Sequence, residues 1–205
     1  MKKILLLVAA SIMSISAINA QNLSTEVVAG MTLSNWAEYP FKTGFQLGAK
    51  FELAMPKLAN GIYTNAGLLF ALKGCNSGIG RKLNAYFIEV PIHIGYKYSI
   101  TNNFAIFGEV GPYIGFGLFG KSDEFYKENY DHFNQTGKMC NTFDVMNRFD
   151  VGVGLRVGGE IKKRYSISVG YDWGLLNTTD SHDTCGSGCK FRTLTISLGY
   201  KLNLK

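Results

Sequence analysis

The segment YFIEVPIHIGYKY, Tyr86–Tyr98, alternates between two kinds of side chain. Every second residue, counted from the first tyrosine, is apolar or aromatic, and the residues between them include Glu89, His93 and Lys97. A period of two indicates a β-strand, because successive side chains point to opposite faces. A tilted strand of about 9–11 residues crosses a bilayer, and tyrosine prefers the boundary between water and lipid. The segment therefore predicts one strand of a membrane barrel.

The first twenty of the 205 residues have the pattern of an export signal. Lys2 and Lys3 precede the apolar run 4–10, and a segment of mostly small residues ends at Ala20. This order is typical of a secretory signal peptide, so we expect residues 1–20 to be removed. Residues 21–205 then form a single barrel domain. The sequence holds no later apolar run of about 18 residues, which argues against a helical membrane protein.

Charge gives little support to nucleic-acid binding. The formal net charge is +6, and without Lys2 and Lys3 it falls to about +4. The basic residues are scattered, apart from the short run at Lys162, Lys163 and Arg164. An exported protein with scattered charge is not expected to bind nucleic acid, and we interpret the run as a solvated turn.

Seven further segments repeat the alternation of the opening one. Short turns and longer connections alternate between them, as in outer-membrane barrels with periplasmic turns and extracellular loops. Eight antiparallel strands can close without a free edge, and an even number places both termini in the periplasm. The prediction is an all-β, eight-stranded antiparallel up-and-down transmembrane β-barrel. Its strands are 25–34, 43–54, 62–73, 86–98, 104–119, 148–159, 165–176 and 191–204.

The pattern also fits a secreted, soluble lipocalin-like barrel, in which the apolar face lines a ligand cavity. Two features favour the membrane barrel, whose apolar face meets lipid. Small and charged residues share the other face and suit the crowded interior of eight strands. Aromatic residues gather near the ends of the apolar face, as in an interfacial girdle. They are Tyr86, Tyr96, Tyr98, Phe104, Phe149, Tyr165, Trp173 and Tyr200.

Acidic and basic residues nearly balance on the face assigned to the lumen. Buried charges require partners, so we interpret this set as a structural network that fills the barrel. A proton or ion pathway is the alternative. No catalytic residue, cofactor or metal is expected there. The predicted lumen charge network comprises Glu52, Glu89, His93, Lys97, Glu109, Asp150, Arg156 and Asp172.

All four cysteines, Cys75, Cys140, Cys185 and Cys189, fall between the predicted strands, in extracellular connections. An even number in an exported protein suggests two disulfides, with three possible pairings. Cys185 and Cys189 could pair with each other, or each could reach another loop. We expect at least one bridge between loops.

Two chemical readings of the last connection carry less weight. His182, Asp183, Cys185 and Cys189 could hold a metal, but an oxidising surface favours disulfides. Ser181, His182 and Asp183 are consecutive, whereas a catalytic triad needs spatial geometry. We expect a polar, non-catalytic loop at this position.

Three stretches resemble one family. They are YFIEVPIHIGYKY, then FDVGVGLRVGGEI with YSISVGYDWGLLN, and finally FRTLTISLGYKLN. Together they resemble the PorT-like outer-membrane β-barrel proteins of the Bacteroidetes. The resemblance spans residue 21 to the end, although the terminal Leu-Lys departs from the aromatic end usual in barrel-assembly signals. It implies an outer-membrane location and, for some members, a link to protein secretion, but no functional residues.

The function expected is that of a small closed outer-membrane barrel without enzymatic activity, structural or acting at the cell surface through disulfide-tied loops. Lipid and lipopolysaccharide are its expected surroundings, and the barrel is expected to be a monomer. Loops 120–147 and 177–190 are candidates for binding an extracellular protein or glycan. The alternatives are a narrow pore, an accessory to secretion, a lipid-acting enzyme and the soluble lipocalin-like barrel.

Overall fold

A computed structural model describes residues 23–36, 39–56, 58–76, 82–123, 139–144, 146–178 and 189–202. Eight of its strands match the eight predicted segments, and a ninth, β6, is short and was not predicted. In the described ranges, no helix is long and apolar enough to cross a membrane. The elements are β1 (Leu23–Trp36), β2 (Lys42–Ala54), β3 (Ile62–Asn76), β4 (Lys82–Thr101), β5 (Phe104–Asp123), β6 (Met139–Asn141), the 3₁₀ turn η2 (Thr142–Asp144), β7 (Phe149–Ile161), β8 (Tyr165–Gly174) and β9 (Phe191–Leu202).

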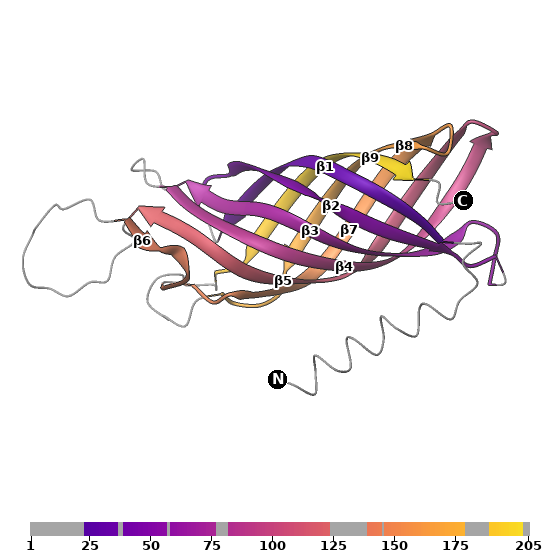
Figure 1. The fold of residues 1–205 in the computed structure, drawn as a ribbon. Helices are drawn as coiled ribbons and strands as arrows, with labels where there is room; N and C mark the ends of the chain where they lie inside the picture. Colours follow the sequence, from indigo (N-terminus) through magenta and orange to yellow (C-terminus); the bar gives the residue numbers. More distant parts are fainter. Residues whose placement is uncertain are drawn as a thin grey trace, which may run out of the picture.

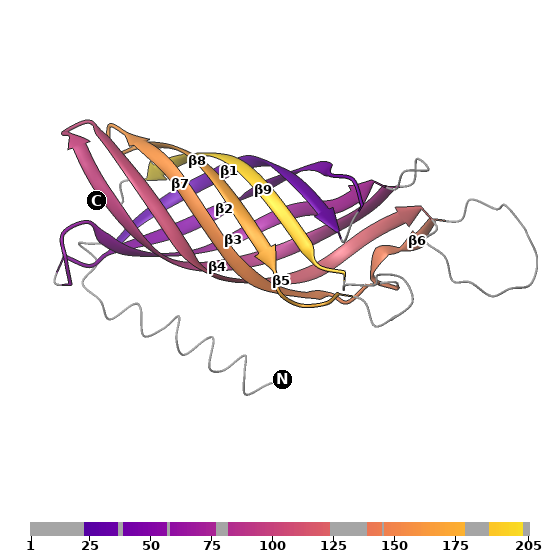
Figure 2. The ribbon, with the colours of Figure 1, turned by 180° about the vertical axis from the view of Figure 1, so that it is seen from behind.

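The strands form one closed antiparallel sheet (Figures 1 and 2). Their order is β4-β3-β2-β1-β9-β8-β7-β5-β6, and the additional pairing of β4 with β5 closes the cylinder. Among the described strands, β6 pairs only with residues 121–123 of β5, whereas β7 pairs with residues 104–116 of the same strand. The barrel wall therefore consists of eight strands, as predicted, and each of them is paired on both edges.

Alternation decides which side chains face the lumen. On β4, Glu89 and His93 are 4% and 2% exposed, whereas Ile92 and Ile94 are 47% and 53% exposed. Each strand repeats this arrangement, so the lumen is polar and the outer wall is apolar. A soluble lipocalin-like barrel requires the reverse, and that alternative is wrong. Exposed apolar side chains on the other strands include Met31, Leu47, Leu68, Ile106, Val157, Ile167 and Leu198.

The two ends of the barrel differ (Figure 1). The short-turn end carries the connections 55–61, 102–103 and 162–164, which join β2 to β3, β4 to β5 and β7 to β8. The opposite end, called here the β6 end, carries the other connections. β4 and β5 have 20 residues each, which is more than any other strand. They extend the wall at the β6 end, where β6 continues it.

Glycines on the lumen face make room for interior aromatic rings. A Cβ atom on Gly95 would lie 2.5 Å from the Tyr63 ring, and one on Gly152 would lie 2.5 Å from the Tyr113 ring. Both distances are far below van der Waals contact, so no larger residue fits without displacing the tyrosine. The regular glycines of the sequence therefore define where large side chains cross the lumen.

The prediction that residues 120–147 are a continuous loop is partly wrong. β5 runs to Asp123, and β6 and η2 occupy 139–144. These residues are ordered because β6 extends the ladder of β5, with Ser122 opposite Cys140. The prediction that no cysteine lies on a strand is also wrong, because Cys75 belongs to β3 and Cys140 to β6.

Candidate functional site

The lumen at the β6 end is closed by a cluster of buried side chains, called here the apolar cap. Phe87 of β4 and Phe191 of β9 meet edge to face with ring centroids 5.7 Å apart. Aromatic and aliphatic side chains packed in this way fill the lumen at this level of the barrel. The cap consists of Trp36, Cys75, Leu83, Ala85, Phe87, Met146, Cys189 and Phe191.

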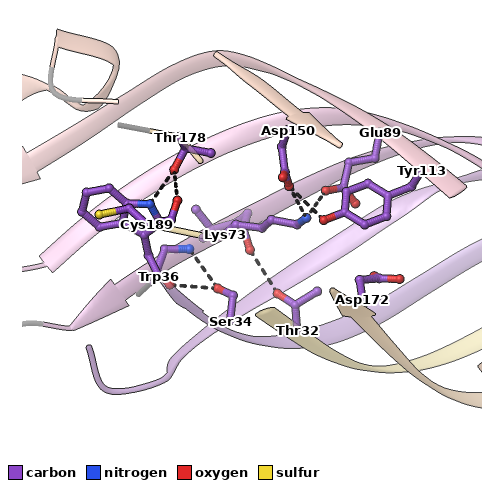
Figure 3. A network of polar contacts seen from close by, with 12 residues as sticks. Thr32, Ser34, Trp36, Lys73, Glu89, Tyr113, Asp150, Asp172, Thr178 and Cys189 are labelled. Carbon is purple, nitrogen blue, oxygen red and sulfur yellow. Dashed lines mark hydrogen bonds and ion pairs between the residues drawn. The ribbon is translucent and has the colours of Figure 1, made fainter. Parts of the chain in front are cut away.

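The chain on either side of the last connection fastens the apolar cap (Figure 3). The Trp36 indole N–H donates to the Thr178 hydroxyl at 2.7 Å, and that hydroxyl donates to the Cys189 carbonyl at 2.8 Å. The Asn147 amide donates to the Thr178 carbonyl at 2.6 Å. The indole N–H is thus satisfied although it is buried, as a tryptophan in a core requires.

Lys73 lies directly beneath the apolar cap and is 1% exposed. Its ammonium forms an ion pair with Glu89 and lies 3.3 Å from Asp150 Oδ2. The Tyr113 hydroxyl donates to the same oxygen at 3.1 Å, and the ammonium lies 4.7 Å from the centre of the Tyr113 ring (Figure 3). The rings of Phe87 and Phe191 complete the enclosure, each 5.8 Å from Nζ. This charge is held by two carboxylates and three aromatic faces.

Four predicted residues form the middle of the lumen. The His93 Nδ1 atom lies 3.2 Å from Arg156 Nη1 and 3.6 Å from Glu109 Oε2. Arg156 Nη2 lies 3.6 Å from Asp172 Oδ2. The other Glu109 oxygen accepts hydrogen bonds from Tyr63 and Asn65, both at 2.9 Å. His93 is therefore one member of a buried group with Glu109 and Arg156.

A third group lies towards the short-turn end, and in it two acids and two bases alternate. Lys97 Nζ lies 2.7 Å from Glu52 and 2.8 Å from Glu160. Lys201 Nζ lies 2.6 Å from each of the same carboxylates. Glu52 and Lys97 keep side-chain exposures of 16% and 17%. Lys201 and Glu160 are more buried, with side-chain exposures of 7% and 6%. Water therefore reaches one side of this group, whereas Lys73 is sealed.

All eight residues of the predicted lumen charge network point inward and belong to these three groups. Six of their partners stand outside the predicted network: Tyr63, Asn65, Lys73, Tyr113, Glu160 and Lys201. Glu160 could have been found, since it continues the alternation Arg156, Gly158, Glu160 to the true end of β7. Tyr63 and Asn65 carry no charge, and only the closed barrel brings them to Glu109. A role beyond filling and pairing stays a prediction.

The cysteines do not follow the predicted pattern of two disulfides. Cys75 has a free thiol and is buried in the apolar cap, so its predicted disulfide is wrong. Its position on β3, facing the lumen, separates it from the connections. Cys189 is disulfide-bonded. Cys185 lies outside the described residues, as does the side chain of Cys140, so the pairing of Cys189 stays open.

The metal and catalytic residues considered for the last connection, and most of the longest loop, lie outside the described residues as well. Residues 179–188, with Ser181, His182 and Asp183, are not among the described residues, nor is 124–138. Across the described part of the chain, no three His, Cys, Asp or Glu residues are grouped as a metal site would require.

A family model shows what kind of barrel this is. The model, described as "Outer membrane protein beta-barrel domain", matches residues 12–180. The chain belongs to this family. Its apolar wall, polar lumen and closed sheet are those of an outer-membrane β-barrel, and the eight-stranded prediction is confirmed. The narrower PorT-like assignment suggested by the sequence motifs stays a prediction.

Solved structures of outer-membrane barrels resemble this chain. Neisserial surface protein A is 9% identical, covers 89% of this chain and 98% of its own, and has a TM-score of 0.52. OprG from Pseudomonas aeruginosa is 10% identical, with coverages of 88% and 96% and a TM-score of 0.48. Ail of Yersinia pestis is 14% identical, covers 88% of this chain and 97% of its own, and has a TM-score of 0.45. The neisserial comparison supports the fold alone. No curated protein matches the sequence.

Proposed function

We propose that this outer-membrane barrel is a closed, non-enzymatic protein that acts at the cell surface through the connections of its β6 end. The observation that carries the proposal is the filled lumen. The apolar cap and the three charged groups occupy the interior from one end towards the other. A barrel filled in this way offers partners its two ends and its lipid-facing wall. The segments 124–138 and 179–188, which lie outside the described residues, belong to connections of the β6 end and are the candidates for contact with a partner.

The proposal includes an orientation. The short-turn end faces the periplasm with both termini, and the β6 end faces outward, as alternating turn lengths favour. An epitope tag within 124–138 is expected to bind antibody on intact cells. The same tag in the turn 102–103 is expected to bind only after the outer membrane is permeabilised. The opposite pattern would reverse the orientation.

Conductance separates the closed barrel from the alternative of a narrow pore. Purified protein in planar bilayers is expected to show no stable open channel, because the apolar cap excludes water. The variant Phe87→Ala/Phe191→Ala, which lacks both large rings of the apolar cap, is recorded in the same bilayers for comparison with the parent protein. Channels in the parent protein would support a transport role and contradict the closed barrel.

The surface role is tested by replacing 124–138 with a glycine-serine linker of equal length. The altered barrel is expected to fold, shown by its changed gel mobility on heating, because no pairing between the described strands involves this segment. Cells that carry the parent protein are expected to bind one or more members of an array of host proteins and glycans, and the linker variant is expected to lose that binding. Equal binding by both would contradict a role for this loop.

Three finer points complete the proposal. The first is that the chain belongs with the PorT-like proteins of the Bacteroidetes, for which its FIEVP motif is the support. The second is that residues 1–20 are a signal peptide, for which Gln21 at the amino terminus of the purified protein is the expected result. The third is that the barrel is a monomer in lipid with lipopolysaccharide as its outer neighbour.

A further inference from the structure

The turn between β7 and β8 contains two strained lysines. Lys162 and Lys163 both have left-handed backbone conformations, with φ angles of 52° and 56°. For side chains with a Cβ atom, this conformation costs roughly 1–2 kcal/mol per residue. The Arg164 amide donates to the Ile161 carbonyl at 3.1 Å, so residues 161–164 form a β-turn, and turns with two left-handed central residues strongly prefer Asn-Gly there. The chain places two long cations where a less strained pair would fit.

The surrounding backbone holds this turn in place. The Lys162 amide donates to the Asn103 carbonyl at 2.7 Å, and the Lys201 amide donates to the Arg164 carbonyl at 2.7 Å. The turn is thus fastened to the neighbouring turn 102–103 and to β9. The strained conformation is therefore a defined feature, and such outliers gather at functional sites.

The three basic side chains of the turn have no acidic partner in the described part of the chain. Lys162, Lys163 and Arg164 are exposed. The nearby carboxylates Glu52 and Glu160 are each held by two lysines of the lumen. The short connections 55–61, 102–103 and 162–164 contain four basic residues, Lys57 and the three of the turn, and no acidic one. Among the described residues, the three basic side chains of the turn 162–164 form no ion pair with a carboxylate, so the turn presents positive charge.

A hollow of about 230 Å³ lies beside the turn. Lys163 lines it together with Ser99, Thr101, Asn102 and Asn103, and Phe104 and Ala105 form part of its wall. Lys97 and Glu160 line it from the lumen, where the Glu160 carboxylate is paired with Lys97 and Lys201. Hydroxyl and amide groups next to a lysine suit the oxygens of a phosphate and of a glycerol group. Because Phe104 is also exposed on the outer wall, the hollow adjoins the surface that meets lipid.

Aromatic side chains place the basic turn at the depth of the lipid headgroups. Tyr165 follows the turn directly, and its ring pairs with that of Tyr200 at a centroid distance of 5.4 Å. Both rings are exposed on the outer wall, as is Phe104. Tyrosine rings of this kind sit at the membrane–water interface, where lysine and arginine meet anionic headgroups.

From these observations we infer that Lys162, Lys163 and Arg164, together with the adjoining hollow, bind the phosphate headgroup of an anionic phospholipid. The lipid belongs to the inner leaflet of the outer membrane. This assignment of the leaflet rests on the proposed orientation, whereas the proposed lipid binding does not depend on the orientation. At the β6 end, by contrast, the connections carry both signs of charge, for example Asp144 and Arg148.

A titration in zwitterionic detergent tests the inference. Short-chain phosphatidylglycerol is added to the full barrel in phosphocholine micelles, and amide resonances are followed by NMR. The resonances of 102–103 and 162–164 are expected to shift saturably with phosphatidylglycerol. They are expected to stay in place with short-chain phosphatidylcholine, and to respond at least tenfold more weakly to glycerol phosphate. Equal responses to the two lipids would overturn the inference, and an equal response to glycerol phosphate would point to a free anion.

The variant Lys162→Asn/Lys163→Gly gives two opposite readouts. It is expected to weaken phosphatidylglycerol binding at least tenfold and to raise the urea midpoint of unfolding, because Asn-Gly relieves the strain. Lys162→Gln/Lys163→Gln keeps the strain and removes the charge, so it should lose binding without gaining stability. The control Lys121→Gln/Lys190→Gln removes two exposed cations from the β6 end and should bind as the parent does. Equal loss in the control would overturn the site. Binding in micelles does not depend on the orientation of the barrel in the membrane. If the epitope-tag test contradicts the proposed orientation, only the assignment of the lipid to the inner leaflet changes.

Discussion

The two ends of the lumen bury charge in different ways. Near the β6 end, Lys73 is sealed under the apolar cap with a side-chain exposure of 1%. Near the short-turn end, Lys97 shares a four-charge group with Glu52 and keeps 17% exposure. An unpaired charge costs most where water cannot replace its partner. The same type of ion pair is therefore expected to matter much more under the cap than at the open end.

Removing the sealed cation should have the largest effect. Lys73→Met leaves Glu89 and Asp150 buried with no cation, which is expected to cost about 3–5 kcal/mol in the free energy of unfolding. Urea unfolding in lipid vesicles measures this cost. The further change Glu89→Gln should recover part of it by removing one of the uncompensated charges. A loss below 1 kcal/mol in the single variant would mean that water reaches Lys73 after all.

Opening the apolar cap comes next. Phe191→Ala removes a fully buried ring that contacts Phe87 and covers Lys73, and it is expected to cost about 3 kcal/mol. The same unfolding measurement applies. Phe191→Leu, which keeps most of the volume, is the matched control and should cost less than half as much. Similar costs for the two would show that volume in the cap is unimportant.

The open group should tolerate the equivalent loss. Lys201→Met leaves Lys97 to pair with Glu52 and Glu160, and water can hydrate the remaining charge. The expected cost is about 1–2 kcal/mol, clearly below that of Lys73→Met. If the two substitutions cost the same, the contrast between the ends of the lumen is wrong.

The cysteines probe the cap with the smallest expected effect. Cys75→Ala removes one buried sulfur atom and is expected to cost about 1 kcal/mol. In the parent protein, an alkylating reagent should modify Cys75 only after unfolding and Cys189 only after reduction. Peptide mapping without reduction then identifies the partner of Cys189. Rapid labelling of Cys75 in the folded barrel would show that the cap is open to solvent.

The strand pattern could be predicted because alternation is a local property. In Tyr86–Tyr98 a period of two separates Glu89 and His93 from the isoleucines, and the closed sheet keeps that separation. The ends of strands were harder to predict. β7 continues to Glu160 and β5 to Asp123 because each pairs with a neighbour that is distant in sequence, Ala105 and Met139 respectively.

The sequence by itself determined an exported chain of eight alternating strands, a polar lumen face and the identity of the charges on it. Only the tertiary structure decided which charges meet, that Phe87 and Phe191 close the lumen, and that Cys75 is sealed among them. The physical reason is that side-chain direction follows from neighbouring residues, whereas contact across the lumen depends on the stagger of the closed sheet. The basic turn shows the same division. Its charge is visible in the sequence, but the strain of Lys162 and Lys163 and the adjoining hollow exist only in the folded barrel.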